Sequence, residues 1–269
     1  MGIFEAFQEQ LGSERNADPR RQHFLNTRMC YPPLIVTSMN MSNDSLSIAS
    51  LNLEAFKLIA HGQYGQSVRL LEAAVRALHT EVRCVNLSNN DVEQIQNETL
   101  ELVAEKVGRN TDSQEEGGVF QIYDRSLLVK DGYEKTDENQ RRVAQTLIYN
   151  MALAYHMSAE KNQGRTRYYR KALKLYRVAS QMHDECSDLA ACDYHVRMAC
   201  LNNMGCIYGQ FSDLCRTREC LVLLRSVLDH FQVLDCCEGI EHEDESHFSL
   251  TVALYARDGC QYTIAAGAA

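Results

Sequence analysis

The chain has no tryptophan and only three prolines among its 269 residues. Because proline interrupts helices, its scarcity leaves long stretches of the chain free to be helical. No apolar run approaches the roughly 20 residues that span a bilayer, so we expect no transmembrane helix. The first residues lack a basic start followed by an apolar run, so we expect no secretory signal and a protein that is not secreted.

The motifs of common catalytic and cofactor sites are also missing. The sequence contains no GxGxxG, GxxxxGK[ST], GxSxG or HExxH motif. It contains no Cys-x-x-Cys pair of the kind found in zinc and redox sites. We therefore expect a protein that is not an enzyme, with no catalytic residues, no cofactor and no bound metal.

A surplus of positive charge is absent as well. The net charge is −9 and the pI is about 5.5, whereas a nucleic-acid-binding protein usually presents a basic surface to the phosphates. The basic residues between Arg165 and Arg177 are interpreted as a solvated helix face. We expect neither a nucleic acid nor a membrane as partner.

Cysteine, in contrast, is abundant and odd in number, with 11 residues. Without a secretion signal, this indicates reduced thiols and an intracellular location, cytoplasmic or nuclear. The cysteines between positions 186 and 220 are interpreted as small buried hydrophobic residues. The segment 236–247 also combines cysteines, histidines and carboxylates. It leaves one alternative open, a thiol- or metal-responsive regulatory protein using the Cys/His-rich C-terminal half.

Composition divides the chain into an arm, a helical domain and a tail. Residues 1–45 are polar and rich in Ser, Asn and Met, which predicts a mostly disordered arm. Apolar residues then recur at helical spacing, which predicts a helical domain over 46–260 that begins with Ser50 or Asn52 as a helix cap. The predicted helix pairs lie at about 50–80, 138–182 and 188–234. A flexible loop is predicted at 108–118 and a flexible tail at 261–269.

Three segments have a less regular pattern. Residues 99–107 favour a short helix. Residues 119–129 are rich in β-branched and aromatic side chains, which favours an extended segment lying along the helices, with a short helix as the alternative. Apolar residues alternate over 248–254, which suggests a strand, although the same residues also suit the start of a closing helix.

The three helix pairs share an internal pattern of small and large side chains. A small residue lets two helix backbones approach, and a large one three or four positions later fills the space on the same face. Within the first, second and third pairs, the small residues of the two helices are 12, 20 and 15 positions apart. Compared with the first pair, this predicts a turn longer by eight residues in the second pair and by three in the third. The predicted packing residues are Ala55, Gly62, Tyr64, Ser67, Leu71 and Ala74, then Ala152, Tyr155, Ala172, Tyr176 and Ala179, and finally Gly205, Tyr208, Cys220, Leu224 and Val227.

This pattern, with the segments YNMALAY and LNNMGCIY and the turn residues Gly62 and Tyr64, resembles the tetratricopeptide repeat family. The resemblance implies an all-α fold in which antiparallel helix pairs stack into a short right-handed α-solenoid. The family's aromatic residue near the start of each pair and its closing proline are weak or absent here.

The resemblance also implies a function as a non-enzymatic adaptor or scaffold. In such a fold the first helices of the pairs line a concave groove that binds partner segments, here with apolar anchors. No lysine or arginine stands where the family binds C-terminal carboxylates, so chaperone tails are not expected as partners. The predicted groove residues are Phe56, Ile59, Tyr149, Asn150, Leu153, His156, Met157, Asn202, Asn203, Cys206 and Gln210.

Two of these groove residues, Asn150 and Asn203, occupy equivalent positions in the second and third pairs. A side-chain amide both donates and accepts hydrogen bonds, so it can hold the backbone of a bound peptide. The alternative for each asparagine is that it caps a neighbouring loop or contacts solvent.

Overall fold

The computed structural model describes residues 47–88, 102–106, 121–129, 132–133, 135–162, 166–182, 191–233 and 242–266. The predicted arm 1–45 and the predicted loop 108–118 lie outside these ranges. Residues Ser47–Ala269 form one compact unit. Its described part is mostly helical, which confirms the all-α prediction in that general form.

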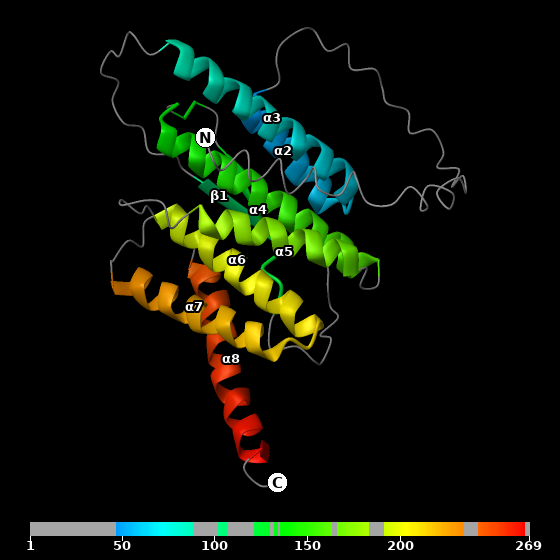
Figure 1. The fold of residues 1–269 in the computed structure, drawn as a ribbon, viewed down its shortest axis with the longest axis vertical. Helices are drawn as coiled ribbons and strands as arrows, with labels where there is room; N and C mark the ends of the chain where they lie inside the picture. Colours follow the sequence, from blue (N-terminus) through cyan, green and yellow to red (C-terminus); the bar gives the residue numbers. More distant parts are fainter. Residues whose placement is uncertain are drawn as a thin grey trace, which may run out of the picture. The chain divides into compact units, whose positions relative to one another are not determined.

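The described elements are, in chain order, α2 (Ile48–Ala60), α3 (Tyr64–Ser88), β1 (Leu102–Lys106), β2 (Arg125–Val129), α4 (Asp137–Lys161), α5 (Thr166–Gln181), α6 (Ala191–Gln210), α7 (Leu214–Val233) and α8 (His242–Ala266). Each helix packs against the next helix along the chain (Figure 1). Contacts also join α2 to α4, α4 to α6, and α6 to α8. None of the helices described here is both long and apolar enough to cross a membrane.

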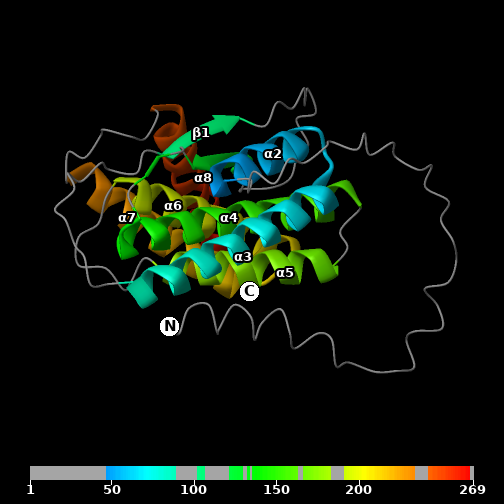
Figure 2. The same cartoon turned by 90° about the horizontal axis from the view of Figure 1, so that it is seen from above.

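The two strands lie on one side of the helices. β1 and β2 pair antiparallel, with Leu102 opposite Val129 and Lys106 opposite Arg125. β2 packs against α2 and α4. Within the unit Ser47–Ala269, Figure 2 shows β1 along one edge and α3 and α5 along the opposite edge, with α2 and α4 between them. The first helices of the pairs therefore face the strands.

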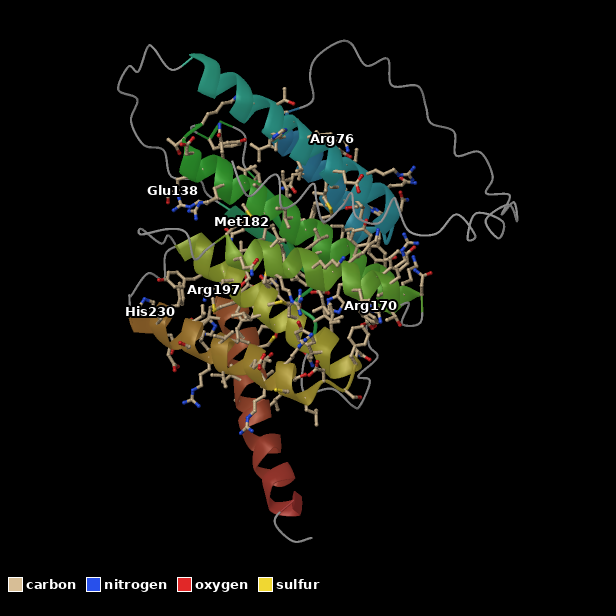
Figure 3. The ribbon with its side chains drawn as sticks, viewed as in Figure 1. Arg76, Glu138, Arg170, Met182, Arg197 and His230 are labelled. Atoms are coloured by element: carbon tan, nitrogen blue, oxygen red, sulfur yellow. The ribbon has the colours of Figure 1, made fainter. Side chains whose placement is uncertain are left out.

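Helix α4 lies at the centre and is buried on almost every side. Every residue from Arg142 to Ala154 is buried, including several polar ones. Its polar side chains bond to neighbouring main chain: Gln145 donates to the carbonyl of Ala179 at 3.0 Å. Arg141 donates to the carbonyl of Met182, labelled in Figure 3, at 2.7 Å. The buried Gln145 is thus tolerated because a specific main-chain partner accepts its hydrogen bond.

The turns α2–α3 and α6–α7 have the same geometry. In the first, the N–H of Gly62 donates to the carbonyl of Ile59 and the N–H of Gln63 donates to that of Leu58. In the second, Ser212 donates to Gly209 and Asp213 to Tyr208. Gly62 and Ser212 both have positive φ angles, 69° and 56°. Both helices therefore end in a Schellman motif, in which a left-handed residue reverses the chain.

This equivalence corrects the expected turn lengths. The α2–α3 and α6–α7 turns each contain three residues, 61–63 and 211–213, so the prediction of a longer third turn was wrong. Thr217, rather than Cys220, stands at the position of Ser67, 12 residues after Gly205. The cause of the error is Ser212, which adopts the glycine conformation without being glycine.

The second pair differs in its helices more than in its turn. α4 ends at Lys161 and α5 begins at Thr166, so the turn is one residue longer than the other two. The prediction of a turn longer by eight residues was therefore wrong. The rest of the longer spacing between Ala152 and Ala172 lies in the helices, because α4 and α5 are each lengthened by about one helical turn there.

Two local predictions at the start of the domain and before the strands were also wrong. Helix α2 is capped by Ser47, whose hydroxyl accepts a hydrogen bond from the N–H of Ser50, so neither Ser50 nor Asn52 is the cap. The segment 99–107 contains β1 instead of a helix. Its side chains suit a helix locally, but pairing with β2 supplies the backbone hydrogen bonds of a strand.

The two segments left open adopt opposite structures. Within 119–129, residues Arg125–Val129 form strand β2. Residues 248–254 belong to helix α8, where Asp244, Phe248 and Thr251 are buried at helical spacing. α8 continues to Ala266, so the predicted tail 261–269 is helical up to that residue.

We predict that Ser212→Gly stabilises the protein by about 0.5–1 kcal/mol, because glycine adopts a positive φ without the steric cost borne by serine. Urea unfolding measures the change. Gly62→Ala is the opposite test, since the backbone of residue 62 has a positive φ and an added Cβ would lie 2.9 Å from the Lys161 amine. A loss of about 1–2 kcal/mol is expected for it. Equal stability of the Ser212→Gly and wild-type proteins would contradict this account of the turn.

Candidate functional site

An extended segment of the chain, residues 121–129, lies across the first helices and is held there through its main chain. We call it the inner segment. Side chains of α2, α4 and α6 donate to or accept from its backbone at several points. These side chains, which we call the clamp residues, are Asn52, Tyr149, Asn150, Asn202 and Asn203.

Two asparagines each hold one residue of the inner segment by both of its backbone groups. The carboxamide of Asn203 accepts from the N–H of Tyr123 at 2.8 Å and donates to its carbonyl at 3.0 Å. The carboxamide of Asn150 accepts from the N–H of Leu127 at 2.9 Å and donates to its carbonyl at 2.7 Å. Each carboxamide thus takes the place of a peptide group on a neighbouring strand.

The remaining clamp residues bond to carbonyls on the same edge. Asn202 donates to the carbonyl of Gln121 at 2.9 Å. The hydroxyl of Tyr149 donates to the carbonyl of Arg125 at 2.9 Å. Asn52, like Asn150, donates to the carbonyl of Leu127, at 3.0 Å.

The bonded carbonyls belong to alternate residues, which point to the same edge of an extended chain. The opposite edge of β2 pairs with β1. Side chains therefore replace a second neighbouring strand.

Contacts among the clamp residues fix their orientation. Asn150 donates to the carboxamide oxygen of Asn52 at 2.9 Å, and Asn202 donates to that of Asn203 at 3.2 Å. Asn203 also donates to the hydroxyl of Tyr176 at 3.1 Å. All five clamp residues are at most 1% exposed. Burial also raises the pKa of the Tyr149 hydroxyl, which therefore stays a neutral donor.

Tyr123 fills an aromatic and polar pocket between α6 and α8. Its hydroxyl lies 2.6 Å from Nε2 of His195. Its ring packs edge-on against His247 at 5.4 Å and tilted against Phe248 at 4.9 Å between centroids. The side chain is 2% exposed, so its hydroxyl needs the partner that His195 provides.

Arg125 occupies an acidic pocket at the start of α8. Its Nη2 lies 2.5 Å from a carboxylate oxygen of Glu243, and its Nε lies 3.0 Å from one of Asp244. Asp244 is 1% exposed, and its other oxygen lies 3.5 Å from Nε2 of His195. The buried carboxylate is thus balanced by the guanidinium of the inner segment.

His195 and His247 are uncharged near neutral pH. Burial lowers the pKa of His195 to about 4, and the positive charge of Arg125 acts in the same direction. Asp244 is close, but its charge is already paired with Arg125. Burial also lowers the pKa of His247.

The structure brings four of the predicted groove residues, Tyr149, Asn150, Asn202 and Asn203, into contact with a bound backbone, which belongs to the same chain. Ile59, Leu153, His156, Met157 and Cys206 are buried, Phe56 is half-buried, and Gln210 is exposed at the end of α6. The predicted packing residues are buried, except for the half-buried Gly62, Tyr64 and Tyr155.

Sequence reasoning missed Asn52 as a clamp residue and missed the pockets around Tyr123 and Arg125. The available signal was the alternation of Tyr123, Arg125, Leu127 and Val129, all of which are buried. The partners of these side chains lie on distant elements, so their positions have no local signature.

Three cysteines, Cys200, Cys206 and Cys220, are buried in the packing of the helices. Burial raises the pKa of the Cys200 and Cys206 thiols far above the ordinary value, and that of Cys220 to about 12. Such thiols carry little thiolate at neutral pH. Among the side chains placed in the structure, no group of three or more His, Cys, Asp or Glu is arranged to hold a metal. Cys236 and Cys237 lie outside the described ranges, so the thiol- or metal-responsive alternative stays a prediction.

Comparison of the chain with protein-family models, with curated proteins and with solved structures finds no match. The resemblance to the tetratricopeptide repeat family therefore stays a prediction.

We predict that Asn150→Ala lowers the free energy of unfolding by about 2–4 kcal/mol, because it removes the partner of the buried Leu127 N–H and of the Asn52 oxygen. Urea unfolding measures the loss, and hydrogen exchange of the Leu127 amide should accelerate in parallel. Asn162→Ala is the matched control. Asn162 is exposed and bonds only within its own helix, to Ser158. A loss of about 0.5 kcal/mol or less is expected there, and equal losses for the two variants would refute a clamping role for Asn150.

Stability should also fall between about pH 6.5 and pH 4. His195 has a folded pKa of about 4 against an ordinary value of 6.5. In this window the unfolded chain binds a proton that the folded chain does not bind. Stability therefore decreases by about 3 kcal/mol as the pH falls, and the effect of His195 levels off below its folded pKa.

Unfolding in urea at a series of pH values measures the slope, with His195→Gln as the control. Glutamine does not titrate, so this variant should lose most of the pH dependence in the window. His247 contributes with the same sign in both proteins. The assignment to His195 fails if the variant and the wild type show the same slope.

Proposed function

We propose that the protein is a non-enzymatic adaptor that binds extended segments of partner proteins in the groove lined by α2, α4 and α6. The observation that carries this proposal is the set of hydrogen bonds from the clamp residues to the main chain of the inner segment. Contacts to the main chain hold a peptide of any sequence in the extended form.

The spacing of the clamp residues suits a peptide that crosses successive helices. Asn150 of α4 and Asn203 of α6 hold Leu127 and Tyr123, which are four residues apart. Four extended residues span about 13 Å, while neighbouring helices pack about 8–10 Å apart. A chain running obliquely across the two helices therefore meets one carboxamide on each helix.

We further propose that the pairs α2–α3, α4–α5 and α6–α7 are repeats of tetratricopeptide type, stacked in a short right-handed solenoid. The identical end geometry of α2 and α6 supports this arrangement. So does the 12-residue spacing from Ala55 to Ser67 and from Gly205 to Thr217, all four of which are buried. Repeats that bury small residues at their seams need a neighbour on each side to complete the core.

The clamp residues lack the features of a catalytic site. Their donors and acceptors meet main-chain groups, and the nearby His195 bonds to the hydroxyl of Tyr123. A catalytic acid or base needs a path to a substrate proton. The polar groups here instead serve recognition of a backbone, which is the role of an adaptor.

The inner segment occupies the clamp in this structure, so a partner has to replace it. A partner bound in the groove should then release the amides of Tyr123 and Leu127, whose N–H groups bond to Asn203 and Asn150. Hydrogen exchange at these two amides is therefore a direct report of groove binding.

The experiment is a selection of random nine-residue peptides on the full chain, followed by hydrogen exchange with the best binders. We expect binding with a Kd in the micromolar range, together with faster exchange at Tyr123 and Leu127. Amides in the middle of α4 are the control and should stay protected. Failure to select any binder would contradict the proposal, and so would binding that leaves the Tyr123 and Leu127 amides protected.

A further inference from the structure

We infer that the partner segment carries the side-chain pattern of the inner segment, with an aromatic residue, an arginine and two aliphatic residues at alternate positions. This inference rests on the proposed function and adds the chemical class of the ligand. The inner segment, with sequence QIYDRSLLV, is then the occupant of a peptide site in its own chain.

The first position selects a tyrosine. The pocket of Tyr123 joins three ring contacts, to His195, His247 and Phe248, with one hydrogen-bond partner for the hydroxyl. A phenylalanine fits the rings but leaves Nε2 of His195 without the hydroxyl. Because a site built to bond a hydroxyl discriminates against the analogue that lacks it, tyrosine is favoured.

The second position, two residues later, selects arginine over lysine. Nε and Nη2 of Arg125 contact two different carboxylates, of Asp244 and Glu243. A planar guanidinium reaches both at once, whereas an ammonium is a single point of charge. α8 carries three acidic residues in its first turn, which favour a cation close to them. The partner is therefore basic at this position.

The last two positions are aliphatic. The side chain of Leu127 is fully buried and that of Val129 is 5% exposed. The carbonyl of Leu127 also accepts hydrogen bonds from both Asn52 and Asn150. A polar side chain there loses the transfer free energy of burial while the backbone bonds stay the same.

The positions between these anchors are less restricted. Ile122, Asp124 and Leu128 keep part of their surface exposed, and Gln121 is exposed. Ser126 is the exception, because it is fully buried and only a small residue fits there. The resulting pattern is Tyr-x-Arg-small-aliphatic-x-aliphatic, which is specific enough to be tested with synthetic peptides.

The test uses the full chain with Tyr123→Ser, Arg125→Ser and Leu127→Ser, called the anchor-free variant. Its own segment keeps the backbone contacts but competes less, because three of its four anchor side chains are gone. Fluorescein-labelled QIYDRSLLV is titrated with it and with the wild type, and anisotropy gives the Kd. We expect the anchor-free variant to bind at least ten times more tightly than the wild type, because the tethered segment of the wild type competes at a high effective concentration.

Peptide variants test each position. Replacement of the tyrosine by phenylalanine, or of the arginine by lysine, should raise the Kd of the anchor-free variant about tenfold or more. Replacement of the first residue, Gln121, by alanine is the matched control and should leave the Kd unchanged. Asn203→Ala in the anchor-free background should also raise the Kd, which places the peptide on the clamp.

Each result decides the inference. If the anchor-free variant does not fold alone, recovery of cooperative unfolding on addition of QIYDRSLLV supports it, and no recovery contradicts it. Equal binding of the tyrosine and phenylalanine peptides, and of the arginine and lysine peptides, overturns it. If the wild type is a dimer in solution and the peptide dissociates it, a second copy of the chain occupies the site. That result overturns the assignment to a separate partner protein.

If selected random peptides release the Tyr123 and Leu127 amides but share none of these side chains, the inference fails. The adaptor proposal then still stands.

Discussion

An extended chain has to satisfy the N–H and C=O groups on both of its edges, and the fold around residues 121–129 is organised by that requirement. β1 satisfies one edge by strand pairing. The other edge faces helices, which offer no free backbone groups, so buried carboxamides supply the missing donors and acceptors. Five fully buried polar side chains on the first helices are tolerable only with this segment in place. The clamp residues and the inner segment are therefore mutually dependent.

The same segment connects the ends of the helical array. Through Asn52 and Asn150 its Leu127 end contacts α2 and α4. Through Tyr123 and Arg125 it contacts Phe248, Glu243 and Asp244 of α8. Replacement of the inner segment by a partner thus removes side-chain contacts of α8 unless the partner brings equivalent anchors. Partner recognition and the docking of α8 therefore use the same interactions.

The helices could be predicted from the sequence because apolar spacing and turn residues are local signals, as at Gly62 and Tyr64. The strand β1 could not, since Leu102–Lys106 favours a helix locally and becomes a strand by pairing with β2. Equivalence between pairs predicts Asn150 and Asn203, whereas the position of Asn52 near the expected helix start also suits a cap, as Ser50 does. Asn52 bonds to a residue 75 positions away, and no local pattern reports such a contact.

A partner and the inner segment make the same hydrogen bonds to the clamp residues, since these bonds involve only the main chain. Those bonds therefore cannot favour one over the other. The inner segment has the advantage of its covalent tether, which gives it an effective concentration on the order of millimolar. A partner present at micromolar concentration has to overcome a factor of about a thousand, so its side chains have to fit the pockets of Tyr123, Arg125 and Leu127 more closely than those of the inner segment do. Selectivity at this site must therefore reside in the alternate side chains, while the asparagines set the extended conformation that both ligands share.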